Sequence, residues 1–414
     1  MAIVVHKYGG SSVGSADRIR TVARRVVSAK EAGNQVVVVV SAMGDTTDDL
    51  TNLAFEISPV PPARELDMLL SAGERISIAL LSMAIIDFGH DAISFTGSQA
   101  GIVTDTSHGK ARIVEVRARR IIESLEAGKI VIVAGFQGVS TDYEITTLGR
   151  GASDTTAVAL AAALSADVCD IYTDVDGVFT ADPRLVPDAR KLHAVSYEEM
   201  LEMAATGARV LALRSVEYAR NYGVVIHVRS SFHEGEGTFV VEEDERMEKA
   251  LISGVTHDTS EAMIRIRRVP DRPGVAARIF GEIATENVNV DMIVQNVSED
   301  GHTDLSFTIP KDDLSRAEKI IEKMAREVGA EGFSADSDIA KVSLVGAGMK
   351  SHPGVAAGMF EVLAEAGINI EMISTSSIRI SVVVRAAEVE SAVKVVHERF
   401  DIPNEAAKRE EHSE

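Results

Sequence analysis

Short runs of β-branched residues alternate with longer segments of helical periodicity from the N-terminus to about residue 230. This alternation is typical of parallel strands joined by crossover helices. The expected strands are Ile3–Val5, Val36–Val40, Ala92–Phe95, Ile130–Ala134, Val168–Thr173 and Val224–Val228. Several of these runs are apolar at every position, which indicates that helices cover both faces of the sheet. We therefore expect an α/β fold, a three-layer αβα domain with a mostly parallel sheet.

Helical periodicity predicts the elements that connect these strands. The expected helices are Ala16–Lys30, Ala72–Phe88, Arg112–Ala127, Asp154–Leu164 and Ala208–Tyr222. Ser153 is expected to cap the fourth of these helices, with Asp154 in its first turn. The stretch 233–249 is rich in Glu, Asp and Gly and lacks an apolar face, so we place the end of the first domain at residue 245.

An internal repeat follows this boundary. Residues 273–293 and 353–373 are identical at ten of 21 positions without a gap. Each copy has the order βαββαβ, which is the ferredoxin-like unit. We expect one unit over 250–338 and a second over 339–405, with strand 250–257 free to pair with the second. A duplicated scaffold without ligands is the alternative interpretation of the repeat.

Composition excludes several classes of protein. The 414 residues include 42 Lys+Arg against 63 Asp+Glu, a net charge of −21, so there is no general basic surface to neutralise nucleic acid phosphates. Cys169 is the single cysteine and cannot form an internal disulfide. The longest apolar runs fall short of the roughly 18 residues of a membrane-spanning helix. We expect a cytoplasmic protein with no nucleic acid or membrane partner.

Glycine-rich and hydroxyl-rich motifs follow the expected strands, where ligands bind in sheets of this kind. Lys7-Tyr-Gly-Gly-Ser-Ser12 ends the first strand, and its glycines allow main-chain N–H groups to approach phosphate oxygens. Ser41-Ala-Met-Gly-Asp-Thr-Thr47 follows the second strand. Taken separately, each motif is equally compatible with a tight turn or a polar loop.

Three further motifs carry charge. Leu148-Gly-Arg-Gly-Ala-Ser-Asp154 places Arg150 before a helix start, where a planar guanidinium suits a carboxylate or phosphate. Residues 172–184 hold three aspartates and a Pro-Arg pair that suit a nucleotide with a hard cation. A calcium loop is disfavoured because Pro183 stands where the liganding glutamate belongs. Glu74 could pair with an amino group or serve as a first-turn acid of a helix.

Together these motifs resemble the amino-acid kinase family, and within it the aspartokinases, over almost the whole chain. The matching segments are KYGGSS, SAMGDTT, SAGERIS, TLGRGASD and TDVDGVFTADPR, followed by two repeats that resemble ACT domains. The resemblance is strongest to the actinobacterial, lysine- and threonine-regulated type. It implies phosphorylation of the L-aspartate side chain by ATP with Mg²⁺, giving 4-phospho-L-aspartate on the way to lysine, threonine and methionine.

The resemblance also assigns roles to residues of this chain. Catalytic positions match Lys7, Asp154 and Arg209. Nucleotide positions match Lys7, Tyr8, Gly9, Gly10, Ser41, Thr173, Asp174, Phe179 and Arg184. Substrate positions match Thr47, Glu74, Arg150, Gly151 and Ser153. No protein-held metal is expected, because Mg²⁺ would be carried by the ATP phosphates.

Effector amino acids, lysine and threonine, are implied at interfaces of the ACT units. The matching positions are Asp271, Pro273, Gly274, Asn289, Asp291, Gln295, Asn296, Thr303 and Asp304 in the first unit, and His352, Pro353, Gly354, Asn369 and Ser376 in the second. A homo-oligomer is implied, or an α2β2 assembly with a shorter chain that begins near Met247.

This chain departs from the family pattern at a few positions. Ala152 replaces a glycine, Phe179 a tyrosine, Arg209 a lysine and Ser377 a glutamate. Arginine keeps the positive charge but changes its geometry, so we expect weakened catalysis rather than its loss. The alternatives are a kinase for glutamate or acetylglutamate, which would lack the tandem ACT units, and an amino-acid sensor that keeps the kinase fold without activity.

Overall fold

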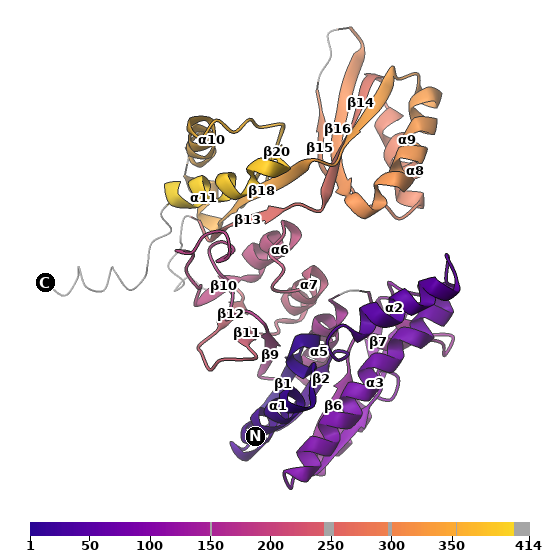
Figure 1. Cartoon of the computed structure of the whole chain (residues 1–414), viewed down its shortest axis with the longest axis vertical. Helices are drawn as coiled ribbons and strands as arrows, with labels where there is room; N and C mark the ends of the chain where they lie inside the picture. The colour runs from indigo at the N-terminus through magenta and orange to yellow at the C-terminus, as the bar shows by residue number, and fades with distance from the viewer. Residues whose placement is uncertain (150, 244–251, 297–299, 353, 401–414) are drawn as a thin grey trace, which may run out of the picture. The chain divides into compact units, whose positions relative to one another are not determined.

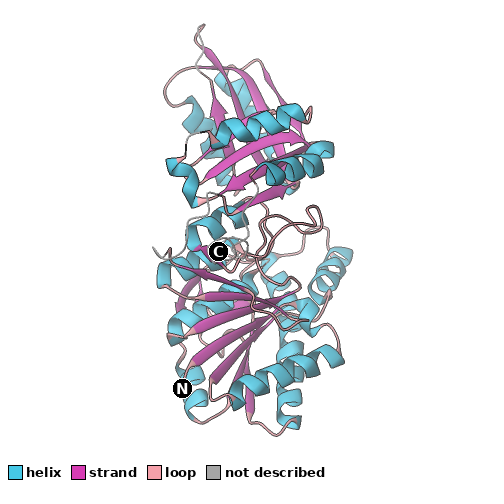
Figure 2. Cartoon of the chain, turned by 90° about the vertical axis from the view of Figure 1, so that its left-hand side faces the viewer, coloured by secondary structure: helices cyan, strands magenta, loops and turns pink. Residues whose placement is uncertain are grey.

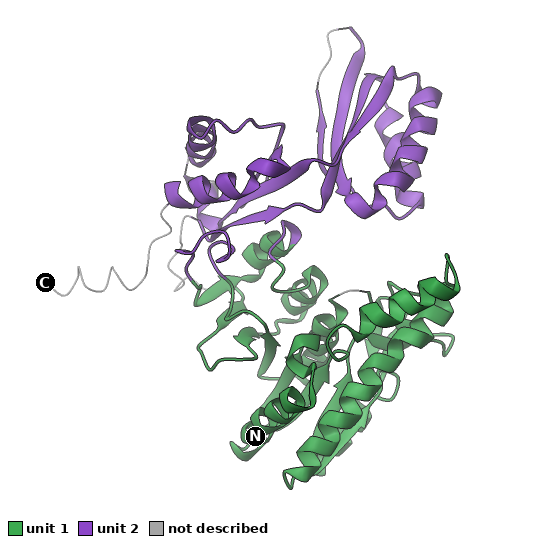
Figure 3. Cartoon of the chain, in the orientation of Figure 1, with its two compact units in different colours: residues 1–178, 191–204, 209–247 green, residues 179–190, 205–208, 248–414 purple. Residues whose placement is uncertain are grey.

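The computed structural model describes residues 1–149, 151–243, 252–296, 300–352 and 354–400. The chain forms two compact units (Figure 3). Unit 1 contains Met1–Val178, Lys191–Ala204 and Arg209–Met247, and unit 2 contains Phe179–Arg190, Ala205–Ala208 and Glu248–Glu414. Two short segments of the N-terminal half therefore belong to the unit built by the C-terminal half.

The centre of unit 1 is an eight-stranded sheet (Figure 1). Its order is β10 (Ala194–Ser196), β12 (Thr238–Val241), β11 (Ile226–Ser230), β9 (Val168–Thr173), β1 (Ile3–Tyr8), β2 (Gln35–Val40), β6 (Ile130–Ala134) and β3 (Ala92–Phe95). All neighbours are parallel except β11 and β12, which are antiparallel. The predicted mostly parallel sheet is confirmed.

Helices cover both faces of this sheet (Figure 2). The helices of unit 1 are α1 (Ala16–Glu31), α2 (Thr46–Ile57), α3 (Ala63–Asp87), α4 (Arg119–Glu126), α5 (Ala152–Leu164), α6 (Tyr197–Ala205) and α7 (Leu213–Tyr222). Buried residues of α1 and α3 share one core cluster with alternate residues of β1 and β2. α5 packs against β1, β2 and β9, and α7 packs against α5. The three-layer αβα architecture is therefore confirmed.

Helix α3 is longer than the sequence pattern predicts. It starts directly after Pro62 rather than at Ala72. By length and composition it could cross a membrane, but half of its apolar window is buried inside unit 1. It packs against β3, β6 and β8, so it is a core helix of this unit.

The predicted helix Arg112–Ala127 is wrong in its first half. Residues Ile113–Val116 form strand β5, and α4 begins only at Arg119. β5 belongs to a second, four-stranded sheet in the order β5, β4 (Ile102–Thr104), β7 (Gln137–Ser140), β8 (Ile145–Thr147). Its residues Ile113, Val114 and Val116 are β-branched, and the antiparallel pairing with β4 stabilises the extended form.

Unit 2 contains the two repeats as two four-stranded sheets. The first sheet has the order β15 (Asp291–Gln295), β16 (His302–Pro310), β14 (Glu261–Pro270) and β17 (Gly332–Asp336), with helices α8 (Val275–Thr285) and α9 (Leu314–Val328). The second has the order β13 (Gly254–Asp258), β18 (Ile339–Val345), β20 (Arg379–Arg385) and β19 (Met372–Thr375), with helices α10 (Val355–Glu365) and α11 (Val389–Arg399). The second repeat has no final strand of its own among the described residues, and β13 occupies that place beside β18.

A segment of the N-terminal half completes the core of the second repeat. Ala181 and Val186 are buried in the same cluster as residues of β18, α10 and α11. The Thr180 carbonyl accepts a hydrogen bond from the Val255 N–H at 2.7 Å, and its hydroxyl lies 2.9 Å from Nε2 of His397 in α11. Residues 179–190 are therefore a structural part of unit 2.

The two repeats are joined by a buried lysine. The side chain of Lys341 in β18 is 1% exposed and forms ion pairs with Glu261 of β14 and Asp291 of β15. Burial alone would lower the pKa of Lys341, but the two carboxylates outweigh it and raise that pKa. Lys341 therefore remains charged inside unit 2.

We predict that Lys341→Met lowers the free energy of unfolding by about 3 kcal/mol, because it leaves two carboxylates without their counter-charge. Urea unfolding of the full chain measures the change. Lys323→Met is the matched control, since Lys323 is largely exposed and its ion pairs are long, at 3.9 and 4.0 Å. Equal stability of both variants would contradict a linking role for Lys341.

Candidate active site

The carboxyl end of β1 supplies a lysine and two glycines. Lys7 lies near the end of the strand with its side chain 12% exposed. Gly9 and Gly10 follow and start a 3₁₀ turn, Gly10–Val13. A Cβ on Gly10 would lie 2.9 Å from the carbonyl oxygens of Ala42 and Gly44, so only glycine fits this close approach of two loops. A Cβ on Gly9 would fill space beside the Lys7 ammonium, 3.5 Å from Nζ.

The first turn of α5 faces this lysine. Lys7 Nζ lies 2.7 Å from Oδ1 of Asp154, and Oδ2 of Asp154 accepts a hydrogen bond from the Ala212 N–H at 3.4 Å. Ser153 Oγ lies 3.0 Å from Ser41 Oγ at the end of β2. The predicted capping role of Ser153 is wrong, because Gly151, at φ +73°, occupies the N-cap. The serine side chain is thereby free to face the strand ends.

Glu74 in α3 contributes a buried carboxylate. It is 2% exposed, and its Oε1 accepts a hydrogen bond from the Ala42 N–H at 3.1 Å. Its Oε2 is buried and forms no short hydrogen bond among the described residues, although the Gln137 side chain interacts with this carboxylate and lowers its pKa. Burial raises the pKa of this carboxyl group to about 7. A buried acceptor without a short hydrogen bond is costly, so Oε2 is a position for a cationic or donor group of a ligand.

Three further predicted residues of unit 1 are Thr47, Thr173 and Arg209. Thr47 is half-buried in the first turn of α2. Thr173 ends β9, and its hydroxyl donates a hydrogen bond to Asp174 Oδ1 at 3.1 Å. Arg209 is exposed in the segment before α7.

Three predicted site residues have surroundings that the sequence did not indicate. The Tyr8 ring is fully buried in the core and stacks on Tyr172 with centroids 4.7 Å apart, so its side chain cannot contact a nucleotide. Phe179 and Arg184 belong to unit 2, and Arg184 pairs there with Asp182 at 2.6 Å. Arg150 lies outside the described residues.

A buried aspartate that sequence reasoning missed holds the loop before α5. Asp67 of α3 is 1% exposed, and its carboxylate accepts hydrogen bonds from the Thr147 hydroxyl and the Gly109 N–H. It also lies 2.7 Å from Nδ1 of His108. Asp67 and Glu74 are seven residues apart and share one face of α3, and this spacing was the signal that could have identified Asp67.

Two more missed residues shape the same loop. Arg214 of α7 donates hydrogen bonds to the carbonyl oxygens of Leu148, at 2.7 Å, and Ala111, at 3.0 Å. Phe136, directly before β7, has φ +67°, and its N–H donates to the Thr156 hydroxyl at 3.2 Å. A non-glycine residue in this region is uncommon and occurs often at functional sites. No local sequence signal indicates either feature.

The predicted effector residues of unit 2 occupy corresponding loops of the two repeats. Gly274 and Gly354 both have left-handed φ, +92° and +103°, and precede α8 and α10. The Asp304 carboxylate accepts a hydrogen bond from the Arg268 N–H at 2.9 Å, and the Thr303 hydroxyl donates to the Asn296 carbonyl. Asp291 pairs with Lys341, so this carboxylate already has a counter-charge.

The other effector positions are mostly at the surface. Asp271, Pro273, Asn289, Gln295, His352, Asn369 and Ser376 are exposed. Pro353 lies outside the described residues.

Comparisons with known proteins agree with this arrangement. Residues 2–230 match the amino acid kinase family, and residues 262–329 and 342–400 each match an ACT domain. An aspartokinase from Mycolicibacterium smegmatis is 59% identical over 97% of both chains.

Two structures of E. coli aspartokinase III, each 26% identical, are also similar to this chain. The complex with aspartate and ADP has a TM-score of 0.80 and is matched over 96% of this chain and 99% of that one. The complex with lysine and aspartate has a TM-score of 0.74 over the same shares. These matches agree with the strand-end motifs, the buried Glu74 and the two ACT repeats described above. The chain therefore belongs to the amino acid kinase family, in its aspartokinase branch with two ACT domains.

Proposed function

We propose that this enzyme transfers the terminal phosphoryl group of ATP to the side-chain carboxylate of L-aspartate and releases 4-phospho-L-aspartate. The observation that carries the proposal is the buried carboxylate of Glu74, whose Oε2 forms no short hydrogen bond and has no cationic partner among the described residues. It provides a counter-charge for a substrate ammonium group near the strand ends that hold Lys7 and the Gly9-Gly10 turn. The similarity to E. coli aspartokinase III in complex with aspartate and ADP supports the same substrate pair.

Phosphoryl transfer to a carboxylate requires a site that positions the two reactants and stabilises negative charge. The side-chain carboxylate of aspartate is ionised at pH 7, so the attacking oxygen needs no general base. Charge on the transferring phosphoryl group must be stabilised, and the Lys7 ammonium is the group assigned to this task. Asp154, 2.7 Å from Nζ, fixes the direction of the lysine side chain.

Substrate recognition is assigned to both ends of the amino acid. Glu74 would hold the ammonium group. Thr47, Arg150, Gly151 and Ser153 are proposed to bind the carboxylate side. Ser153 Oγ already points to the strand ends, toward Ser41.

The nucleotide side is proposed to include the main chain of Gly9 and Gly10, with Ser41, Thr173 and Asp174. Phe179, Arg184 and Arg209 remain predictions from the family resemblance, as does any main-chain contact of Tyr8. Mg²⁺ would be carried by the ATP phosphates and would neutralise part of their charge. Asp174 is exposed at the end of β9 and offers carboxylate oxygens of the kind that Mg²⁺ prefers.

We also propose feedback control by lysine, threonine or both through the ACT units. The complex of E. coli aspartokinase III with lysine supports an amino acid effector. Such control requires that the effector bind an inactive arrangement more tightly than the active one. The assembly proposed is a homo-oligomer or α2β2 with a shorter regulatory chain. A cytoplasmic location in the pathway to lysine, threonine and methionine follows from this activity.

The first experiment measures ATP consumption with L-aspartate, L-glutamate and N-acetylglutamate in parallel, each repeated with millimolar lysine, threonine and both. We expect turnover with aspartate alone, suppressed by at least one effector. Turnover on aspartate that neither effector suppresses would support the proposed kinase activity and refute the proposed feedback control. Absence of turnover on all three acids would favour a sensor without activity.

Lys7→Ala is expected to lower kcat by roughly 10²–10³, the cost of losing one charge-stabilising donor in a phosphoryl or acyl transfer site. Steady-state kinetics with saturating ATP and aspartate measure it. Lys30→Ala, at the far end of α1, is the matched control and should keep normal turnover. Thermal unfolding of both variants tests whether the fold is retained. Near-normal kcat in a folded Lys7→Ala enzyme would refute the role of Lys7.

Glu74 is expected to set the acid limb of the pH profile. Its carboxyl group must be ionised to bind an ammonium group, and its pKa is about 7. The value of kcat/KM for aspartate should therefore fall about tenfold per pH unit below pH 7. Glu74→Gln should lower kcat/KM at pH 8 by roughly 10- to 100-fold and abolish this acid limb. An acid limb that persists in Glu74→Gln would assign the titration to another group.

A further inference from the structure

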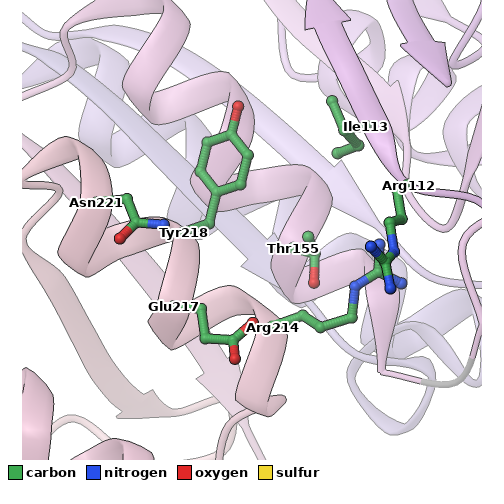
Figure 4. A pocket seen from close by; sticks show the side chains of 7 residues that line it. All are labelled: Arg112, Ile113, Thr155, Arg214, Glu217, Tyr218 and Asn221. Carbon is green, nitrogen blue, oxygen red and sulfur yellow. The ribbon is translucent and has the colours of Figure 1, made fainter. Parts of the chain in front are cut away.

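A pocket of about 340 Å³ lies in unit 1 beside the loop that precedes α5. It is lined by Thr155 of α5, by α7 and by the start of β5 (Figure 4). Arg112 and Arg214 enter it from opposite sides, and Figure 4 shows both guanidinium groups directed to the same part of the pocket. None of the residues assigned above to aspartate or ATP lines it.

The two guanidinium groups are close enough to affect each other. Burial and the charge of Arg112 both lower the pKa of Arg214. Arg214 is fixed by its hydrogen bonds to the Leu148 and Ala111 carbonyl oxygens. Among the described residues, no carboxylate lies within ion-pair distance of either arginine, including Glu217 on the pocket wall. Glu217 and Asp105 raise the pKa of Arg214 from beyond ion-pair distance, but they do not offset burial and the charge of Arg112. Two like charges with no carboxylate in direct contact are unfavourable unless a ligand compensates them.

The helix that carries Arg214 adds to the positive potential. Arg214 is in the first turn of α7, where the helix dipole disfavours a cation. That turn contains no acidic residue, and the N-cap Ala212 makes no side-chain capping bond. In a chain of net charge −21, this local concentration of positive charge is an exception.

We propose that this pocket binds a small oxyanion, a phosphate or a carboxylate, between Arg112 and Arg214. Two guanidinium groups can donate several hydrogen bonds to such an anion, and the Thr155 hydroxyl lies on the same wall. Since Arg214 also holds the Leu148 carbonyl, the anion would bind next to the loop that carries Arg150. The site goes beyond the proposed function and does not depend on it.

Isothermal titration calorimetry of the full chain tests the proposal, with inorganic phosphate and succinate as separate probes at constant ionic strength. A non-hydrolysable ATP analogue and aspartate are kept saturating, so that the catalytic site is filled. We expect saturable binding of at least one probe, weakened at least about tenfold by Arg112→Gln. Binding of phosphate alone, succinate alone or both identifies the preferred anion, and each of these outcomes supports the site.

Arg117→Gln is the matched control, because Arg117 is exposed on the same stretch of chain, pairs with Glu115 and lies outside the pocket. It should bind the probes as the unmodified chain does. Arg112→Lys, which keeps the charge without the planar fork, should show intermediate affinity and replaces Arg112→Gln if that variant does not fold. Absence of binding by both probes, or equal binding by Arg112→Gln, would overturn the proposal.

Discussion

The contact between Lys7 and Asp154 connects the parts on which the kinase site depends. It joins the end of the central strand β1 to the first turn of α5, two elements separated by almost 150 residues in the sequence. The carboxyl ends of parallel strands lie at one edge of the sheet. A helix that starts beside them presents main-chain N–H groups that have no partner within the helix. The ion pair fixes the direction of the lysine and leaves the glycine turn open.

Helix α3 adds the second constraint, since it carries two buried carboxylates with different environments. Asp67 has donors from Gly109, between β4 and β5, and from Thr147 at the end of β8, so its oxygens are satisfied within the protein. Glu74 has one satisfied oxygen and one that lacks a short hydrogen bond. One face of a single helix therefore both holds the chain around Thr147 and Gly109 and leaves one carboxylate oxygen without a short hydrogen bond. This difference in hydrogen bonding separates the structural carboxylate of Asp67 from the carboxylate that we propose binds the substrate.

Sequence reasoning succeeded where a local pattern determines the structure. The apolar strands, the two repeats and the strand-end motifs were all predicted. The spacing of apolar residues and the positions of glycines are signals that a short stretch of sequence carries by itself. Sequence reasoning failed where a distant partner decides the conformation: β5 is extended because it pairs with β4. The Tyr8 ring is in the core because alternate residues of β1 face α1. Arg214 could not be predicted, since its carbonyl acceptors lie 66 and 103 residues away.

The burial of residues 179–190 in unit 2 has a consequence for synthesis on the ribosome. Domains generally fold in the order in which they emerge. Here, Ala181 and Val186 share a core with α11, and Thr180 contacts His397 in that last described helix. The loop that follows β9 therefore cannot reach its final packing until almost the whole chain has been translated. The core of unit 2 is therefore closed only once α11 has been synthesised.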